Sequence, residues 1–210
     1  MVPIAFDVPE ESDPGPYPIP PDAAIEGGPA ADGDRHVLVI DSDNCLLYEL
    51  DAAYPQEGGA SWSAFSGAVF DLRSNDLRPE TWTSADAAGL PIYPGLVKYD
   101  EVMTDGAITH AVRFTVSSSQ AGYIDPARHY ASDDSSPSLP PMGLRLRMKA
   151  DYDCSSLSAE AQVLCAGFKK YGLIVADNGS DWYVSGVPDP RWSDENLADI
   201  ANITGDAFEV

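Results

Sequence analysis

The sequence predicts a mainly-β fold, an antiparallel β-sandwich or barrel-like core with two short helices. Two runs, 107–116 and 143–149, alternate apolar and polar residues, as half-buried strands do. Two further regions place a pair of apolar runs around a short turn, the pattern of a β-hairpin. Because 44% of the 210 residues are hydrophobic, the chain has enough apolar material to build a core.

The N-terminal region, residues 1–34, differs in composition from the rest. It holds many prolines and acidic residues but no lysine or arginine. Proline fixes φ and removes a backbone donor, so we expect an extended arm rather than a helix. The arm serves either as a linker or lies on the outside of the domain through Tyr17 and Ile19, without joining its core. Residues 35–210 are then expected to form a single mainly-β domain.

The first half of that domain reads as strands and a loop. HVLVID (36–41) and CLLYEL (45–50) flank a short turn and predict a hairpin. SWSAFSGAVFDL (61–72) predicts one or two more strands. Residues 78–95 predict a long structured loop, with a short helical turn from Ser84 to Gly89.

The second half contains the alternating strands and both helices. In the strand 107–116, every second residue from Ile108 to Val116 lies on one, mainly apolar face. In the strand 143–149, Arg145, Arg147 and Lys149 lie on the polar face. GLIVA (172–176) and WYVSG (182–186) predict a second hairpin around an Asn-Gly turn. One helix is expected from an apolar stripe with i, i+4, i+7, i+11 spacing, formed by Leu157, Ala161, Leu164 and Phe168. A second, short helix is expected at 193–202, with Ser193 as its N-terminal cap.

Charge and cysteine content limit the partners and the compartment. Twelve Lys and Arg against 34 Asp and Glu give a net charge of −22, which disfavours binding to nucleic acid or an anionic membrane. No apolar run is long enough to span a membrane, and the first residues have neither a basic region nor a long apolar run of a signal peptide. The cysteines are either three buried thiols or include a bridge from Cys154 to Cys165.

A candidate site is predicted around two of the three histidines. PARHYAS (126–132) groups an anion holder, a base and a proton donor in one loop, and His110 lies on a strand. The predicted catalytic residues are therefore His110, His129 and Tyr130, although an ordinary loop and a buried strand histidine fit the same pattern. The predicted substrate-binding residues are Arg113, Arg128, Arg145, Arg147 and Trp82. The basic stripe either lines a groove for an anionic polymer such as a uronate or neutralises acidic neighbours.

No metal or cofactor is expected. The paired histidines of a cupin-type metal strand are absent, and so are the common nucleotide-binding and hydrolase motifs. Asp41 and Asp43 resemble the start of a calcium loop, but the glycine and the terminal glutamate of such a loop are missing.

Several blocks of the chain resemble a family of secreted, mostly uncharacterised bacterial mainly-β proteins. The blocks are DPGPYPIP, DRHVLVID, WTSADAAGLPI, PARHYAS and VADNGSDWY. The resemblance covers nearly the whole chain and includes all three histidines. It implies a secreted, extracellular protein, and it implies no particular activity.

Two functions follow as expectations. The first is a secreted carbohydrate-active enzyme that cleaves a polysaccharide as a lyase or hydrolase, with arginines holding the substrate and His and Tyr moving protons. The second is a non-catalytic extracellular binding or surface-assembly module, which could self-associate through the N-terminal arm. Whether the protein is an enzyme stays open at this point.

Overall fold

The structure is a computed structural model that describes residues 1–210, and strands dominate it. About 25% of the residues lie in strands and 18% in helices, which confirms the mainly-β class. The chain forms two compact units, which are described separately. The first unit comprises Met1–Ile92 with Asp125–Ala131, and the second comprises Tyr93–Ile124 with Ser132–Val210.

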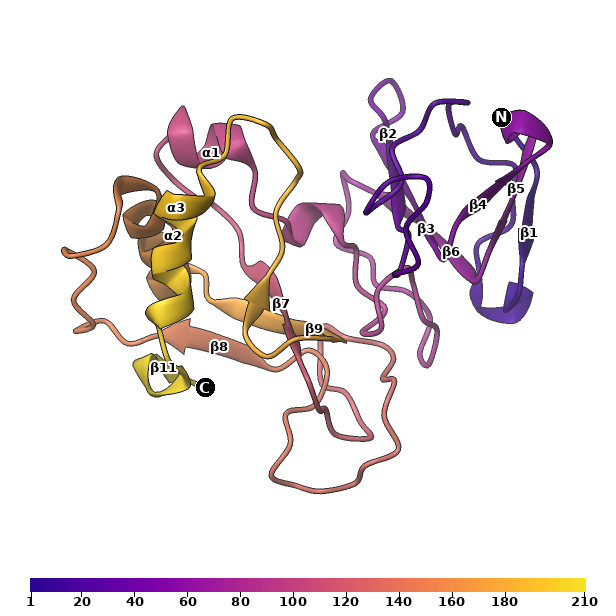
Figure 1. Cartoon of the computed structure of the whole chain (residues 1–210). Helices are drawn as coiled ribbons and strands as arrows, with labels where there is room; N and C mark the ends of the chain where they lie inside the picture. Colours follow the sequence, from indigo (N-terminus) through magenta and orange to yellow (C-terminus); the bar gives the residue numbers. More distant parts are fainter. The chain divides into compact units, whose positions relative to one another are not determined.

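The first unit contains two three-stranded sheets (Figure 1). One sheet has the order β1–β5–β4, and its strands are β1 (Ile4–Phe6), β5 (Ser61–Ala64) and β4 (Tyr54–Gln56). The other has the order β2–β3–β6, and its strands are β2 (Val37–Asp41), β3 (Leu46–Asp51) and β6 (Ser66–Asp71). The predicted hairpin 36–50 is confirmed, because β2 and β3 pair antiparallel from Val37 with Leu50 to Asp41 with Leu46.

The core of the first unit includes residues of the N-terminal region. Tyr17 is fully buried, and Ile19 is nearly so. Both pack in one apolar cluster with Trp62 of β5 and Leu50 of β3. The expectation that residues 1–34 stay outside the core is therefore wrong for this stretch. An ion pair between Arg78 and Asp13 helps to hold this acidic, proline-rich segment there.

The second unit contains one five-stranded sheet with the order β10–β7–β9–β8–β11. Its strands are β7 (Val112–Val116), β8 (Arg145–Met148), β9 (Leu173–Asn178), β10 (Tyr183–Val184) and β11 (Phe208–Glu209). The hairpin predicted for 172–186 is wrong, because β10 pairs with β7, and β9 runs parallel to β7. The pairs β7–β9 and β1–β5 are both parallel, so two of the three sheets are mixed. The sheet β2–β3–β6 is purely antiparallel, as predicted. All three sheets are open, and none closes into a barrel.

Three α-helices and five 3-10 turns complete the fold. The helices are α1 (Tyr99–Met103), α2 (Ala159–Lys170) and α3 (Asp194–Leu197). The 3-10 turns are η1 (Pro9–Glu11), η2 (Glu57–Gly59), η3 (Tyr93–Gly95), η4 (Ala198–Asn202) and η5 (Gly205–Ala207). The two predicted helices are confirmed: Ser158 caps α2 by accepting from the Ala161 amide, and Ser193 caps α3. The helical turn expected at 84–89 is absent, and this stretch consists of bends and turns.

Two features hold α2 in place within the second unit. A disulfide joins Cys154, in the segment before the helix, to Cys165 within it. Cys45 is the one free thiol, so the alternative of three thiols is wrong. The C-terminal segment with α3 packs beside α2 (Figure 1).

None of the helices is both long and apolar enough to cross a membrane.

Candidate ligand pocket

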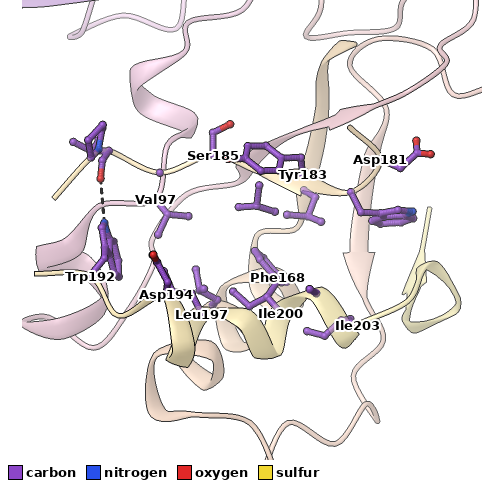
Figure 2. Close-up of a pocket in the computed structure, with 18 of the residues that line it drawn as sticks. Val97, Phe168, Asp181, Tyr183, Ser185, Trp192, Asp194, Leu197, Ile200 and Ile203 are labelled. Atoms are coloured by element: carbon purple, nitrogen blue, oxygen red, sulfur yellow. Dashed lines mark hydrogen bonds between the residues drawn. The ribbon is translucent and has the colours of Figure 1, made fainter. Parts of the chain in front are cut away.

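A cavity of about 480 Å³ opens in the second unit between α2, α3 with η4, and the segment 181–188. Leu164 and Phe168 contribute from α2, and Leu197 and Ile200 contribute from α3 and η4. Figure 2 shows Phe168, Leu197 and Ile200 below the segment that carries Tyr183 and Ser185. The helical stripe predicted from the sequence therefore serves two purposes, since it buries part of α2 and exposes Leu164 and Phe168 to a cavity.

Trp182 lines the pocket and is fixed on several sides. Its ring stacks between Phe114, at a centroid distance of 5.4 Å, and Phe208, at 5.1 Å. Its backbone has φ +56°, an uncommon conformation for a side chain of this size. Gly205 lies so close that an added Cβ would stand 2.7 Å from the indole. The indole is still 39% exposed, so a rigidly held aromatic surface faces the opening.

Trp192 also lines the pocket, and hydrogen bonding and ring contacts orient it. Its Nε1 donates to the carbonyl oxygen of Val187 at 3.1 Å, the dashed contact in Figure 2. The Tyr99 ring meets it edge-on at 5.0 Å, and the Arg191 guanidinium lies 4.0 Å from the centre of that Tyr99 ring. Arg191 also bonds both carboxylate oxygens of Asp189, which lowers the pKa of that carboxyl to about 2. The loop that carries Trp192 is thus held by an ion pair in addition to its prolines.

Few polar side chains line the cavity, and none is cationic. They are Ser185, Asp181 and Asp194, apart from the Tyr183 hydroxyl and the indole nitrogens of Trp182 and Trp192. Asp181 accepts from the Ser117 amide at 2.7 Å and from the Ser117 hydroxyl at 2.9 Å, and these bonds lower the pKa of its carboxyl. The pocket thus combines an apolar interior with two acidic side chains.

The predicted catalytic residues belong to different units. His110 lies in the second unit, just before β7 rather than within it. Its Nε2 is 3.2 Å from Oε2 of Glu101, and its Nδ1 is 2.9 Å from the Ala111 carbonyl oxygen. Glu101 also accepts from the Lys98 amide at the start of α1. His110 therefore contacts Glu101, which caps the N-terminus of α1.

His129 and Tyr130 lie in the first unit. His129 Nδ1 contacts the Ala87 carbonyl oxygen at 2.8 Å, and its ring lies nearly parallel to the Tyr130 ring with centroids 6.1 Å apart. The predicted grouping of this pair is therefore present. Neither residue lines the pocket of the second unit.

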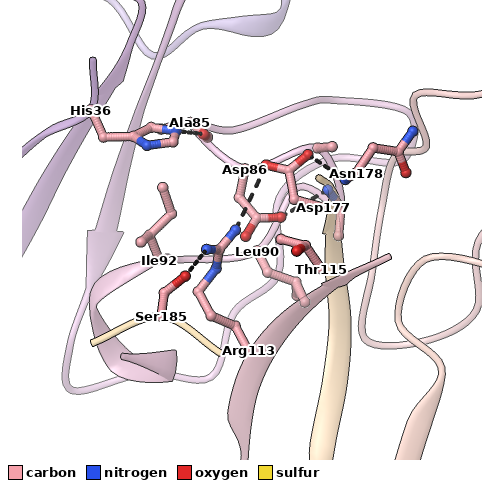
Figure 3. A network of polar contacts seen from close by, with 12 residues as sticks. His36, Ala85, Asp86, Leu90, Ile92, Arg113, Thr115, Asp177, Asn178 and Ser185 are labelled. Atoms are coloured by element: carbon pink, nitrogen blue, oxygen red, sulfur yellow. Dashed lines mark hydrogen bonds and ion pairs between the residues drawn. The ribbon is translucent and has the colours of Figure 1, made fainter. Parts of the chain in front are cut away.

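The predicted substrate-binding arginines all have partners within their own units. Arg113 is buried and donates to Ser185 at 3.3 Å, with Asp177 at 3.7 Å (Figure 3). Arg128 pairs with Glu80 and Asp125 at 2.9 and 3.1 Å.

The two arginines on β8 are exposed and also bonded. Arg145 donates to the Tyr171 carbonyl oxygen, and Arg147 pairs with Glu209 of β11 at 2.9 Å. Trp82 of the first unit, predicted as a sugar platform, lies 5.4 Å from the Arg78 guanidinium. Within the basic stripe, only Arg147 contacts an acidic side chain on a neighbouring strand, whereas Arg145 and Lys149 donate to backbone carbonyl oxygens.

Sequence reasoning missed the pocket itself. Trp82 was the one tryptophan predicted to bind substrate, whereas Trp182 and Trp192 line the cavity. The segments DWY (181–183) and RW (191–192) flank two prolines within a dozen residues, and this local concentration of aromatic residues was the available signal. The pairing of β10 with β7, which brings Trp182 against Phe114, had no such signal.

Comparisons with known proteins give no match. No family model, no curated protein and no solved structure is significantly similar to this chain. The family resemblance described from the sequence blocks therefore stays a prediction.

Proposed function

We propose that the protein is a non-catalytic binding module whose second unit takes a small, uncharged, apolar ligand. The observation that carries this proposal is the cavity of about 480 Å³ with Trp182 and Trp192 in its lining. Small-molecule sites in proteins are concave, are lined mainly by apolar and aromatic side chains, and usually have volumes of about 300–1,000 Å³. The size and the lining of this cavity both fall within that description.

The electrostatics of the pocket select against anions. Asp181 and Asp194 lie in its lining, no lysine or arginine does, and the whole chain carries a charge of −22. An anionic ligand such as a uronate or a fatty acid would bring its charge next to these carboxylates without a compensating cation. An uncharged ligand meets no such penalty.

The polar content of the lining argues for an apolar ligand rather than a sugar. A sugar ring carries several hydroxyl groups, and each needs a partner when it leaves water. The interior is formed by residues such as Leu164, Phe168 and Ile200, which offer none. A flat apolar molecule can instead rest against the indoles and the aliphatic side chains and lose only its contact with water.

The chemical groups of the pocket support binding rather than catalysis. Its lining contains no histidine, cysteine or lysine side chain. Asp181 is engaged by Ser117, so it is not placed as a free base. The polysaccharide-cleaving enzyme expected from the sequence stays a prediction, and its arginines are all paired in this structure.

An extracellular location is part of this proposal. The disulfide between Cys154 and Cys165 supports it, because disulfides persist in oxidising compartments. The large excess of acidic residues supports solubility in such a medium. Self-association through the N-terminal region stays a prediction.

We also propose that the two sheets of the first unit form a small sandwich, supported by the cluster that joins Trp62 and Leu50.

A fluorescence titration tests the proposed function. The probe is N-phenyl-1-naphthylamine, an uncharged apolar dye that becomes brighter when it leaves water. We expect saturable binding of one dye per chain, with a dissociation constant on the order of 10 µM for a ligand of this size. Dye fluorescence that rises without saturation, or not at all, would argue against a binding pocket.

Two matched variants assign the dye to the pocket. Ala201 lies in the lining on η4, and Ala198 lies on the same turn outside the lining, and both are exposed. Ala201→Trp should fill the cavity and weaken binding at least about tenfold, which is about 1.4 kcal/mol. Ala198→Trp should bind as the parent does. Competition with a neutral oligosaccharide and with a uronate oligomer adds a second test, and displacement of the dye by either sugar would favour a carbohydrate ligand instead.

A further inference from the structure

His36 is held in one orientation by a backbone carbonyl in the first unit. Its Nε2 lies 2.8 Å from the carbonyl oxygen of Ala85, and Figure 3 shows this contact. A carbonyl oxygen only accepts hydrogen bonds, so the hydrogen of this contact belongs to Nε2. The neutral imidazole is thereby fixed in the tautomer that leaves a lone pair on Nδ1.

That lone pair faces a carboxylate at close range. Nδ1 of His36 is 2.6 Å from Oε2 of Glu26. A bare imidazole lone pair and a carboxylate oxygen repel each other, so a positive centre belongs between them, either a proton or a metal ion. Metal-binding histidines commonly show this arrangement, in which the second ring nitrogen donates to a carbonyl and one nitrogen is directed at the ion.

A third ligand atom completes the group. One carboxylate oxygen of Asp34, one of Glu26 and a ring nitrogen of His36 all lie within 4.8 Å of one another. The His36 side chain is only 10% exposed, whereas that of Glu26 is 59% exposed. The group therefore has an oriented, largely buried imidazole nitrogen and an exposed carboxylate on the solvent side.

The loop that joins these residues is already ordered. Arg35 is almost fully buried, and it donates to the carbonyl oxygens of Pro29 at 3.1 Å, Ala31 at 2.8 Å and Ala53 at 3.2 Å. The Glu26 amide donates to the His36 carbonyl oxygen at 3.0 Å. One buried guanidinium thus fixes the path of the chain between the three side chains, and little ordering is left for a ligand to cause.

We propose that Glu26, Asp34 and His36 form a binding site for a divalent transition-metal ion of the zinc type. An imidazole nitrogen with two carboxylates suits zinc, and three protein ligands leave a fourth position for water or another ligand. A hard ion such as Mg²⁺ or Ca²⁺ prefers oxygen ligands only and gains nothing from the imidazole.

Metal binding requires one small rearrangement. Two ligand atoms on a tetrahedral zinc ion, each at about 2.1 Å from it, stand about 3.4 Å apart. Nδ1 and Oε2 are closer than this, so the proton between them leaves and Glu26 turns outward. Its exposure gives it room to do so. Asp51 lies on the other side of the ring, at 3.8 Å from Nε2, and is not part of the ligand set.

Calorimetric titration of the whole 210-residue chain, without an affinity tag, with zinc chloride tests the proposal. Cys45→Ser is used as the background because Cys45 is the free thiol and a thiolate would bind zinc on its own. We expect one zinc ion per chain, and no heat of binding with magnesium chloride. Weak binding of several ions without a defined stoichiometry would overturn the proposal.

A pair of isosteric variants assigns the ion to these residues. Asp34→Asn should weaken zinc binding at least tenfold, and Glu26→Gln should do the same. Asp32→Asn, which removes the same charge from an exposed residue of the same loop, should bind as the background protein does. Equal affinity of Asp34→Asn and Asp32→Asn would overturn the proposal.

An NMR measurement gives a readout that does not depend on mutating the histidine. In a long-range ¹H–¹⁵N spectrum, zinc should shift Nδ1 of His36 and leave the rings of His110 and His129 unchanged. A shift at His110 or His129 with none at His36 would place the ion elsewhere and overturn the proposal.

Discussion

Nη1 of Arg78 lies 2.6 Å from Oδ2 of Asp13, a residue 65 positions earlier in the chain. The same guanidinium donates to the Glu11 carbonyl oxygen at 2.7 Å and to the Thr83 carbonyl oxygen at 2.6 Å, and only 3% of the Arg78 side chain is exposed. A buried arginine thus fastens the N-terminal segment at the point where Tyr17 enters the core. This contact makes a segment that looks like a linker part of the folded unit.

The first prediction concerns this ion pair. Asp13→Asn leaves the buried Arg78 charge without its carboxylate, so we expect the free energy of unfolding to fall by about 2 kcal/mol. Asp22→Asn changes the same charge at an exposed residue of the same segment and should have almost no effect. Urea unfolding of both variants measures the difference, and equal midpoints would contradict the role given to Arg78.

The second prediction concerns alkaline pH. Burial raises the pKa of Tyr17 well above its ordinary value of 10.0, and the nearby Asp13 charge raises it further, against a lowering by Arg78. Above about pH 10 the unfolded chain releases the Tyr17 proton while the folded chain retains it, so stability is fully present below that pH and falls as the pH rises. The expected slope is about 1.4 kcal/mol per pH unit.

Tyr17→Phe provides the control for this slope. Phenylalanine has no proton to release, so the variant should lose less stability between about pH 9 and pH 11 than the parent does. The variant is expected to be less stable at neutral pH, because the Tyr17 hydroxyl donates to the Asp13 carbonyl oxygen at 2.8 Å. Guanidinium unfolding at several pH values compares the two slopes, and parallel curves would count against a buried, protonated Tyr17.

The third prediction concerns the disulfide. Cys154 and Cys165 are 11 residues apart, and closing a loop of this length restricts the unfolded chain by about 2–3 kcal/mol. The double variant Cys154→Ser/Cys165→Ser should therefore be less stable by about this amount, whereas Cys45→Ser should not. Thiol titration of the unfolded, unreduced protein should find one thiol per chain, and three would show that the bridge does not form.

The fourth prediction concerns Trp182 in the lining of the pocket. A Cβ at Gly205 would stand 2.7 Å from the Trp182 ring, so Gly205→Ala should displace this indole from its stack with Phe208. We expect weaker binding of the neutral dye, by roughly threefold to tenfold. Gly122→Ala, in the same unit with no atom near the added Cβ, is the matched control. Unchanged dye affinity in Gly205→Ala would show that Trp182 does not contact the ligand.

Local sequence patterns predicted those elements that depend on contacts between residues a few positions apart. The hairpin 36–50 has two apolar runs around one turn, and α2 has both an apolar stripe and the Ser158 cap, so residues a few positions apart determine each. The strand 107–116 was predicted too long, because Ile108 is buried outside β7 rather than within it. Burial alone does not distinguish a strand residue from a packed loop residue.

Distant pairings and the pocket were beyond such patterns. The Asn178-Gly179 turn favours a hairpin, yet β10 pairs with β7 and leaves β9 beside β7 in parallel. Likewise, an acidic, proline-rich segment looks unstructured until Arg78 supplies a partner. Trp182 becomes a pocket wall only because Phe114 and Phe208, from β7 and β11, stack on it. These contacts join residues far apart in sequence, so no window of the sequence contains them.

The indole N–H signals of the four tryptophans test the proposed pocket most directly. Trp182 and Trp192 line the cavity, whereas Trp62 and Trp82 lie in the first unit. In a ¹H–¹⁵N spectrum titrated with N-phenyl-1-naphthylamine, the signals of Trp182 and Trp192 should move together and saturate, and those of Trp62 and Trp82 should stay in place. Movement of Trp62 or Trp82 while Trp182 and Trp192 stay unchanged would contradict a ligand site in the second unit.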